Sequence, residues 1–250
     1  MLSSFAMILA YIIIFTLIGS ILSLLGGFAL VLKNKLTDGL SNKFIAFAAG
    51  ALLSVAFLDL FPEAVEEAGE LNVFIPALIG FISFFFAERY LRLFHHHHKH
   101  GKKPTIPLIL IGDGIHNFVD GVVIAVAFLA SIPLGITTSL AVAAHEVPQE
   151  IADMGVLLAN GLSRSKAIFY NLLSGLTALV GALGAFFFSD FVEQYLYLFL
   201  SVAAGHFIYI AASDLVPELH EKIEGNKLTQ TIIFLSGVIV IFIFTRVFEA

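Results

Sequence analysis

The chain has 250 residues, of which 59% are hydrophobic and 13% charged, with a formal net charge of −6 and a mean hydropathy of +0.97. These values are typical of a protein that crosses the membrane several times, and they leave no polar segment long enough for a soluble catalytic domain. The absence of a basic patch excludes nucleic acid as a partner. The chain has no cysteine, which excludes disulfides, thiolate nucleophiles and thiolate metal sites.

Eight apolar stretches approach or exceed the length of about 20 residues that a membrane-spanning helix needs. The first has neither the basic region nor the cleavage site of a signal peptide, so we interpret it as a membrane helix. The chain is therefore predicted to be a single all-α integral membrane domain over residues 1–250. The predicted spans are 5–32, 43–61, 72–94, 105–130, 133–159, 165–189, 193–216 and 228–248.

The lysine and arginine residues predict the orientation of these spans. All of them except Arg246 lie in the loops after the first, third, fifth and seventh spans or at the adjoining helix ends. Because basic loops remain cytoplasmic, these loops are predicted to face the cytoplasm and both termini to lie outside the cell membrane.

The third loop, residues 95–104, contains five histidines in six consecutive positions. Histidine-rich tracts bind transition metals weakly. We interpret the segment as a cytoplasmic loop that senses or buffers metal, and a simple solvated loop is the alternative.

The second and seventh spans share a sequence pattern. An Ala-Gly pair precedes Asp-Leu-x-Pro-Glu at the same spacing in residues 49–63 and in residues 204–218. The two spans run in opposite directions, and inverted repeats of this kind are typical of secondary transporters. The alternative is a helix-end signal that is used twice. The acidic residues Asp59, Asp214 and Glu218 of this pattern could line a metal path or be solvated at the helix ends.

Two polar clusters interrupt the apolar sequence of the fourth and fifth spans. A carboxylate at the centre of a membrane helix costs about 2.5–3.5 kcal/mol, so a cation or water must meet it. Ionisable residues at this depth indicate a functional site. Spacings of three, four and seven place the members of each cluster on one helix face. The fourth span contributes Asp113, His116, Asn117 and Asp120, and the fifth contributes His145, Glu146, Gln149, Glu150 and Asp153.

A short turn through Ser131 and Pro133 makes the two spans antiparallel neighbours, so the two polar faces are predicted to meet. Imidazole and carboxylate ligands without thiolate indicate Zn²⁺, Fe²⁺ or Mn²⁺ in a site that can release the ion. Pro148 is expected to kink the fifth span, and Gly121 to allow a neighbouring helix to approach closely. His206, by contrast, is expected to be solvated near the end of the seventh span.

The segments His116-Asn-Phe-Val-Asp-Gly121 and His145-Glu-Val-Pro-Gln-Glu150 resemble the ZIP family of divalent-metal transporters. The similarity is strongest to the subfamily with His-Asn-Phe-x-Asp-Gly in the fourth helix and His-Glu-x-Pro-His-Glu in the fifth. The resemblance implies eight helices in a 3+2+3 arrangement with an inverted repeat, and an elevator-like movement. It also implies import of Zn²⁺, and often Fe²⁺, Mn²⁺ or Cd²⁺, as the transported substrate, with no cofactor.

The resemblance also assigns ligands. It places one metal position at His116, Asp120, His145 and Gln149, and an adjacent position at Asn117, Asp120 and Glu146. Asp113 and Glu150 join Asp59, Asp214 and Glu218 as candidates for the rest of the path. The expected partners are a divalent metal ion and the lipid bilayer, and a homodimer is compatible with the sequence.

Two departures from the family pattern affect the metal site. Gln149 stands where the subfamily has histidine, and residues 175–181 of the sixth span lack the acid that some relatives place there. The Gln149 amide is a weaker, uncharged ligand and so affects the ion selectivity and the number of bound metals. The missing acid favours one well-held metal over two. An intramembrane zinc-dependent protease or hydrolase is the alternative function, but it needs His-Glu-x-x-His, and Gln149 replaces the second histidine. The chain is therefore predicted not to be an enzyme.

Overall fold

The computed structural model describes residues 2–33, 38–93, 106–221 and 226–248, and within these ranges all regular secondary structure is helical. The predicted histidine-rich loop, residues 95–104, lies outside the described residues. The elements in chain order are α1 (Leu2–Lys33), α2 (Asp38–Ser54), the π-helix η1 (Val55–Leu60), α3 (Phe61–Ala68), α4 (Phe74–Leu93), α5 (Ile106–Ala130), α6 (Ile132–Ala159), α7 (Arg164–Phe187), α8 (Ser189–Gln194), α9 (Leu196–Tyr209), the π-helix η3 (Ile210–Leu215), α10 (Val216–Glu221) and α11 (Lys227–Phe248).

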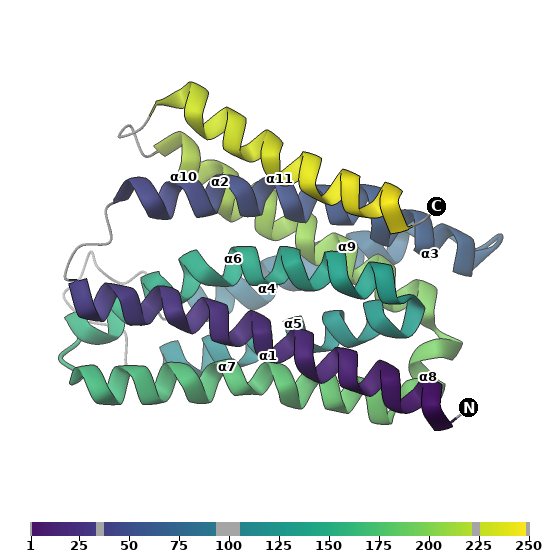
Figure 1. Cartoon of the computed structure of the whole chain (residues 1–250), viewed down its shortest axis with the longest axis horizontal. Helices are drawn as coiled ribbons and strands as arrows, with labels where there is room; N and C mark the ends of the chain where they lie inside the picture. Colours follow the sequence, from purple (N-terminus) through teal and green to yellow (C-terminus); the bar gives the residue numbers. More distant parts are fainter. Residues whose placement is uncertain (1, 34–37, 94–105, 222–225, 249–250) are drawn as a thin grey trace.

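Six helical stretches among the described residues are long and apolar enough to cross a membrane: Phe5–Leu25, Asn42–Ala68, Leu110–Ala130, Arg164–Phe187, Leu196–His220 and Lys227–Val247. The two other predicted spans, α4 and α6, also form helices. Helix α6 is long enough to span, but its second half carries a polar cluster that lowers its hydropathy. The start of α1 and the end of α11 lie at the same end of the bundle (Figure 1).

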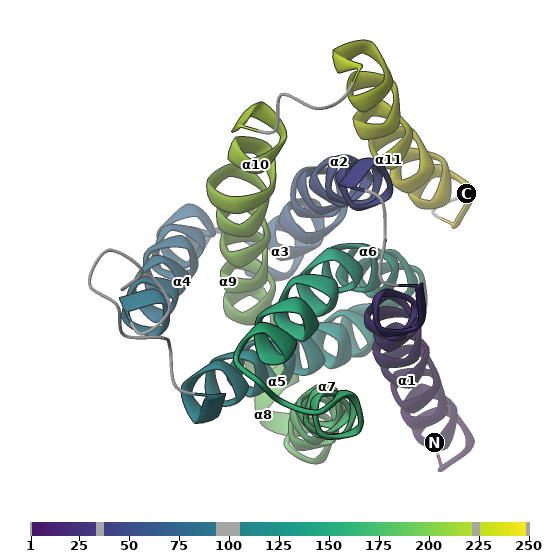
Figure 2. The same cartoon turned by 90° about the vertical axis from the view of Figure 1, so that its left-hand side faces the viewer.

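The helices form two groups that are visible when the bundle is viewed from its end (Figure 2). In the first group, α5 packs mainly on α7, and α1 packs on α6 and α7. In the second group, α2 packs on α11, and α4 packs on α9. Helix α6 also packs on α2 and so forms the main connection between the groups.

Reciprocal pairs of glycines bring three helix pairs into backbone contact. Between α5 and α7, a Cβ atom on Gly121 would collide with the Ala178 carbonyl, and one on Gly181 would collide with the Phe118 carbonyl. The close approach predicted at Gly121 is therefore confirmed. The same arrangement joins α2 to α11 through Gly50 and Gly237, and α4 to α9 through Gly80 and Gly205.

The Asp-Leu-x-Pro-Glu pattern coincides with a distortion of the backbone in both of its copies. Asp59 lies in η1 and Asp214 lies in η3, and each π-helix ends two residues before the proline of the pattern. Proline cannot donate a backbone hydrogen bond and clashes with the carbonyl four residues earlier, and a widened turn relieves this. The sequence match between the second and seventh spans thus extends to backbone geometry, and through Gly50 and Gly205 to packing.

The turn between α5 and α6 positions the two polar faces. Ser131 caps α6 by accepting a hydrogen bond from the backbone N–H of Leu134 at 3.3 Å, and a proline occupies the first turn. Helix α6 then continues as one helix through Pro148. The antiparallel arrangement predicted from the short turn is present, and it brings His116 of α5 against His145 of α6.

Candidate metal site

Four side chains from α5 and α6 converge on one point between these helices. His116, Asp120, His145 and Glu146 each place one ligand atom within 4.8 Å of all the others. Nε2 of His145 lies 3.1 Å from Oδ2 of Asp120, and Nε2 of His116 lies 3.2 Å from Oε1 of Glu146. The two Nε2 atoms are 3.3 Å apart. Two imidazole nitrogens and two carboxylate oxygens form a ligand set that suits Zn²⁺ and related divalent ions.

The four-residue site is closed to solvent on most sides. Asp120, His145 and Glu146 are buried, and His116 is half-buried. Oδ2 of Asp120 and both carboxylate oxygens of Glu146 accept no hydrogen bond of normal geometry. The nearest polar atoms to two of these oxygens are the Nε2 atoms of His145 and His116, and buried carboxylates are costly unless a cation meets them. These atoms therefore fit a bound metal ion.

The backbone of α6 orients the ring of His145. Its Nδ1 atom lies 3.3 Å from the carbonyl oxygen of Ala141, one turn earlier. An Nδ1–H group that donates to this carbonyl leaves the lone pair of Nε2 free to bind metal, as in many metal sites in proteins.

Aromatic residues of the second helix group cover the site. The Phe84 ring of α4 meets the His116 ring edge-on, with centroids 5.6 Å apart, and it also packs on His206 of α9 at 5.2 Å. The expectation that His206 is solvated is wrong. This residue is half-buried, and its Nε2 lies 3.3 Å from the Ser83 hydroxyl. Its contacts with Phe84 and Ser83 of the neighbouring α4 explain the difference.

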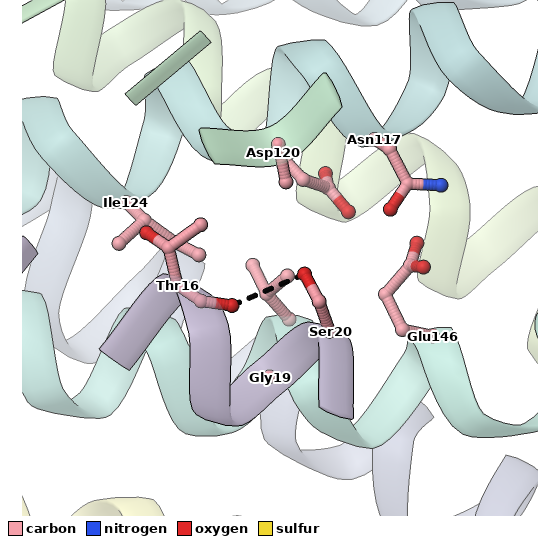
Figure 3. Close-up of a pocket in the computed structure, with 9 residues that line it drawn as sticks. Thr16, Gly19, Ser20, Asn117, Asp120, Ile124 and Glu146 are labelled. Carbon is pink, nitrogen blue, oxygen red and sulfur yellow. Dashed lines mark hydrogen bonds between the residues drawn. The ribbon is translucent and has the colours of Figure 1, made fainter. Parts of the chain in front are cut away.

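Asn117 and Gln149, which the family resemblance also assigned as ligands, lie next to the four-residue site. The Asn117 amide donates to Oδ1 of Asp113 at 2.9 Å, and the Gln149 side chain lies beside the same carboxylate. A small cavity adjoins the site and is lined in part by Asn117, Asp120 and Glu146. These three side chains point toward this space, and Ser20 of α1 faces them from the other side (Figure 3).

The remaining candidates lie apart from the four-residue site. Glu150 is fully buried on α6. Asp59 belongs to the second helix group and is buried rather than solvated, and its carboxylate accepts a 2.5 Å hydrogen bond from the Thr245 hydroxyl of α11. Asp214 and Glu218 are half-buried in η3 and α10.

A family model described as "ZIP Zinc transporter" matches residues 6–108 and 106–245. The chain is 42% identical over 133 residues to "Zinc transporter foi" of Drosophila melanogaster, covering 52% of this chain and 19% of that protein. It is 42% identical over 112 residues to "Zinc transporter ZIP10" of Homo sapiens, covering 45% and 14%. It is 38% identical over 115 residues to "Metal cation symporter ZIP14" of Xenopus tropicalis, covering 46% and 24%. The matched segments thus span less than a quarter of each of these curated relatives.

Proposed function

Because the chain belongs to the ZIP zinc transporter family, we propose that it carries a divalent metal cation, most readily Zn²⁺, across the cell membrane into the cytoplasm. Fe²⁺, Mn²⁺ and Cd²⁺ are further substrates of the proposal. The convergence of His116, Asp120, His145 and Glu146 on one point inside an apolar bundle is the observation that carries it. The relatives named zinc transporter or metal cation symporter support the same substrate class.

The four-residue site is proposed to hold the transported ion. Its ligands come from two neighbouring helices, and Asn117 and Gln149 lie within a turn of them. The adjoining cavity at Asn117, Asp120 and Glu146 would be a second binding position for the ion. This position would bind the ion more weakly, because α7 lacks the acid that some relatives place there. The hydrolase alternative finds no support, since the family consists of transporters and the second histidine of the protease motif is absent.

The proposed architecture has eight membrane spans in a 3+2+3 arrangement with an inverted repeat. The matched π-helices η1 and η3 support the repeat, as do the equivalent glycine contacts of α2 with α11 and α9 with α4. The distribution of basic residues supports an orientation with both termini outside the cell, and a homodimer is the proposed assembly. The histidine-rich loop, residues 95–104, would then face the cytoplasm and buffer the incoming metal.

The proposed path runs from the acidic outer face to the four-residue site and then toward the cytoplasmic ends of α5 and α6. Asp113 and Glu150 lie on that side of the site in the proposed orientation. Asp59, Asp214 and Glu218 would line the second helix group, past which the first group moves in an elevator-like step. The division of the bundle into two packed groups supports such a movement.

Radiolabelled Zn²⁺ uptake into proteoliposomes tests the proposal. We expect His145→Ala and Asp120→Ala each to abolish most uptake, while Ser139→Ala, a buried polar change on the same helix, leaves it intact. Unchanged uptake in both ligand variants would refute the site. No uptake of any divalent metal by the wild-type chain would refute the function.

A further inference from the structure

A second group of polar side chains lies about one helical turn from the four-residue site, toward the first residues of α5 and the last residues of α6. We call it the second cluster. It brings together residues from α5, α6 and α7, and its members are Asp113, Gln149, Glu150, Asp153, Asn171 and Ser174.

The contacts within the second cluster connect the three helices. The Asp113 carboxylate accepts a hydrogen bond from the Asn117 amide at 2.9 Å. The Gln149 amide and the Ser174 hydroxyl lie beside the same carboxylate. The Asn171 amide of α7 lies beside the Glu150 carboxylate of α6. The Asp113 carboxylate of α5 is thus faced by polar groups of α6 and α7. The Glu150 carboxylate of α6 is faced by polar groups of α5 and α7.

Two facing members are buried without a hydrogen bond of normal geometry. Glu150 and Asn171 are both 0% exposed. Neither oxygen of Glu150 accepts a hydrogen bond of normal geometry, and neither the oxygen nor the nitrogen of Asn171 makes one. Buried polar groups in folded proteins nearly always form well-aligned hydrogen bonds, so a facing pair that forms none indicates a ligand between them. A cation between the Glu150 carboxylate and the Asn171 oxygen would supply that partner.

The charges around Glu150 favour the same conclusion. The strongest charged neighbours acting on Glu150 are the carboxylates of Asp113, Glu146 and Asp153. Asp113 and Glu146 act likewise on Asp153. Carboxylates that are buried next to one another repel, and a divalent cation placed among them turns this repulsion into attraction.

We propose that the second cluster is a separate cation-binding position, which receives the metal ion from the four-residue site on its way out of the bundle. This inference rests on the proposed transport function. The second cluster offers only oxygen ligands from carboxylate, amide and hydroxyl groups, whereas the four-residue site also offers imidazole nitrogens. Oxygen-only sites suit Mn²⁺ and other hard cations and hold Zn²⁺ less selectively. The first position would therefore select the ion, and the second would pass it on.

Mn²⁺ binding to the purified full chain tests this position directly, because bound Mn²⁺ can be distinguished from free Mn²⁺ by electron paramagnetic resonance. Every protein in the series carries serine in place of His95 to His98 and His100, so that the loop does not bind the probe. We expect the His116→Ala/His145→Ala variant to retain one bound Mn²⁺. Adding Glu150→Gln and Asn171→Leu to this variant should weaken that binding at least tenfold.

Two control variants test whether Mn²⁺ binding depends on the carboxylate at position 150. Glu150→Asp retains the carboxylate and should retain Mn²⁺ binding, while Glu67→Gln makes the same charge change at an exposed position and should have no effect. Absence of bound Mn²⁺ in the His116→Ala/His145→Ala variant, or equal binding after Glu150→Gln and Asn171→Leu, would overturn the second position.

Zn²⁺ uptake separates this inference from the proposed function. We expect Glu150→Gln alone to reduce uptake about tenfold while Zn²⁺ affinity at the four-residue site is retained, since that site keeps all four ligands and Glu150 forms no hydrogen bond with any of them. Full uptake by Glu150→Gln, together with loss of uptake by His145→Ala, would refute the second position and leave the transport function standing. Full uptake by His145→Ala would refute the function itself.

Discussion

The two helix groups of this chain are built differently. The group of α1, α5, α6 and α7 contains the polar faces, with five carboxylates and two imidazoles on α5 and α6 alone. The group of α2, α4, α9 and α11 contains two matching halves, each with a π-helix and a glycine contact at equivalent positions. In the proposed function, the first group supplies the metal ligands, and the second group is the frame against which the first group packs. The candidate metal-binding residues and the matched π-helices thus lie in separate sets of helices.

The largest effect is expected from removing a ligand in the first group. His145→Ala should lower Zn²⁺ affinity at least about 100-fold, because loss of even an outer partner of a metal ligand costs about 10- to 100-fold. Isothermal titration calorimetry measures this in the background that lacks the loop histidines. His206→Ala changes a histidine of the second group and should leave the affinity within a few fold. Equal losses of Zn²⁺ affinity in His145→Ala and His206→Ala would show that the first group is not the one that binds the ion.

The next largest effect concerns the α5–α7 contact that holds the first group together. Gly121→Val should destabilise the protein by about 3 kcal/mol or more, since its side chain would have to displace the backbone of Ala178. Thermal unfolding in detergent measures the change. Gly184→Ala on α7 is the matched control, because a Cβ atom there meets nothing within 4 Å and the added methyl group favours the helix. Similar melting temperatures for wild type and Gly121→Val would contradict this packing.

A smaller effect is expected in the second group, at the hydrogen bond between α11 and η1. Thr245→Val removes the donor to Asp59 and should cost about 1.5–3 kcal/mol, the usual contribution of a hydrogen bond to a charged group. Thr231→Val makes the same change at an exposed position of α11 and should cost much less. Zn²⁺ affinity should be unchanged in both variants. A large loss of Zn²⁺ affinity in Thr245→Val would show that packing within the second group affects metal binding in the first group.

The smallest effect is expected at Gln149, at the border of the four-residue site and the second cluster. Gln149→His should raise the preference for Zn²⁺ over Mn²⁺ about three- to tenfold, because imidazole favours zinc. Competition binding with the two ions measures the ratio, and Gln194→His at an exposed position is the control. An unchanged ratio would show that position 149 does not tune selectivity.

The helices and the polar faces could be predicted from the sequence because both depend on regular spacing. Apolar runs set the spans, and intervals of three and four residues placed His116 with Asp120 and His145 with Glu146 on common faces. The short turn at Ser131 then made the two faces neighbours. Local pattern was sufficient for all of these features.

The features that were missed depend on tertiary contacts. Phe84 covers His116, yet it is one of 26 phenylalanines and its position in the sequence gives no sign of this role. The environment of His206 was predicted wrongly, because its distance from a predicted helix end said nothing about the neighbouring α4. The π-helices at Asp59 and Asp214 were not predicted either, although the shared prolines after them are the signal in the sequence.

The proposed function requires that His116, Asp120, His145 and Glu146 bind the transported ion together. X-ray absorption spectroscopy of the Zn²⁺-loaded chain, with serine in place of the loop histidines, tests it most directly. The structure predicts that Zn²⁺ is surrounded by nitrogen and oxygen ligands and that the spectrum contains outer-shell scattering from two imidazole rings. The His116→Ala/His145→Ala variant should lose this imidazole scattering. A spectrum without imidazole scattering, or one that this double substitution leaves unchanged, would show that the four residues do not bind the ion together.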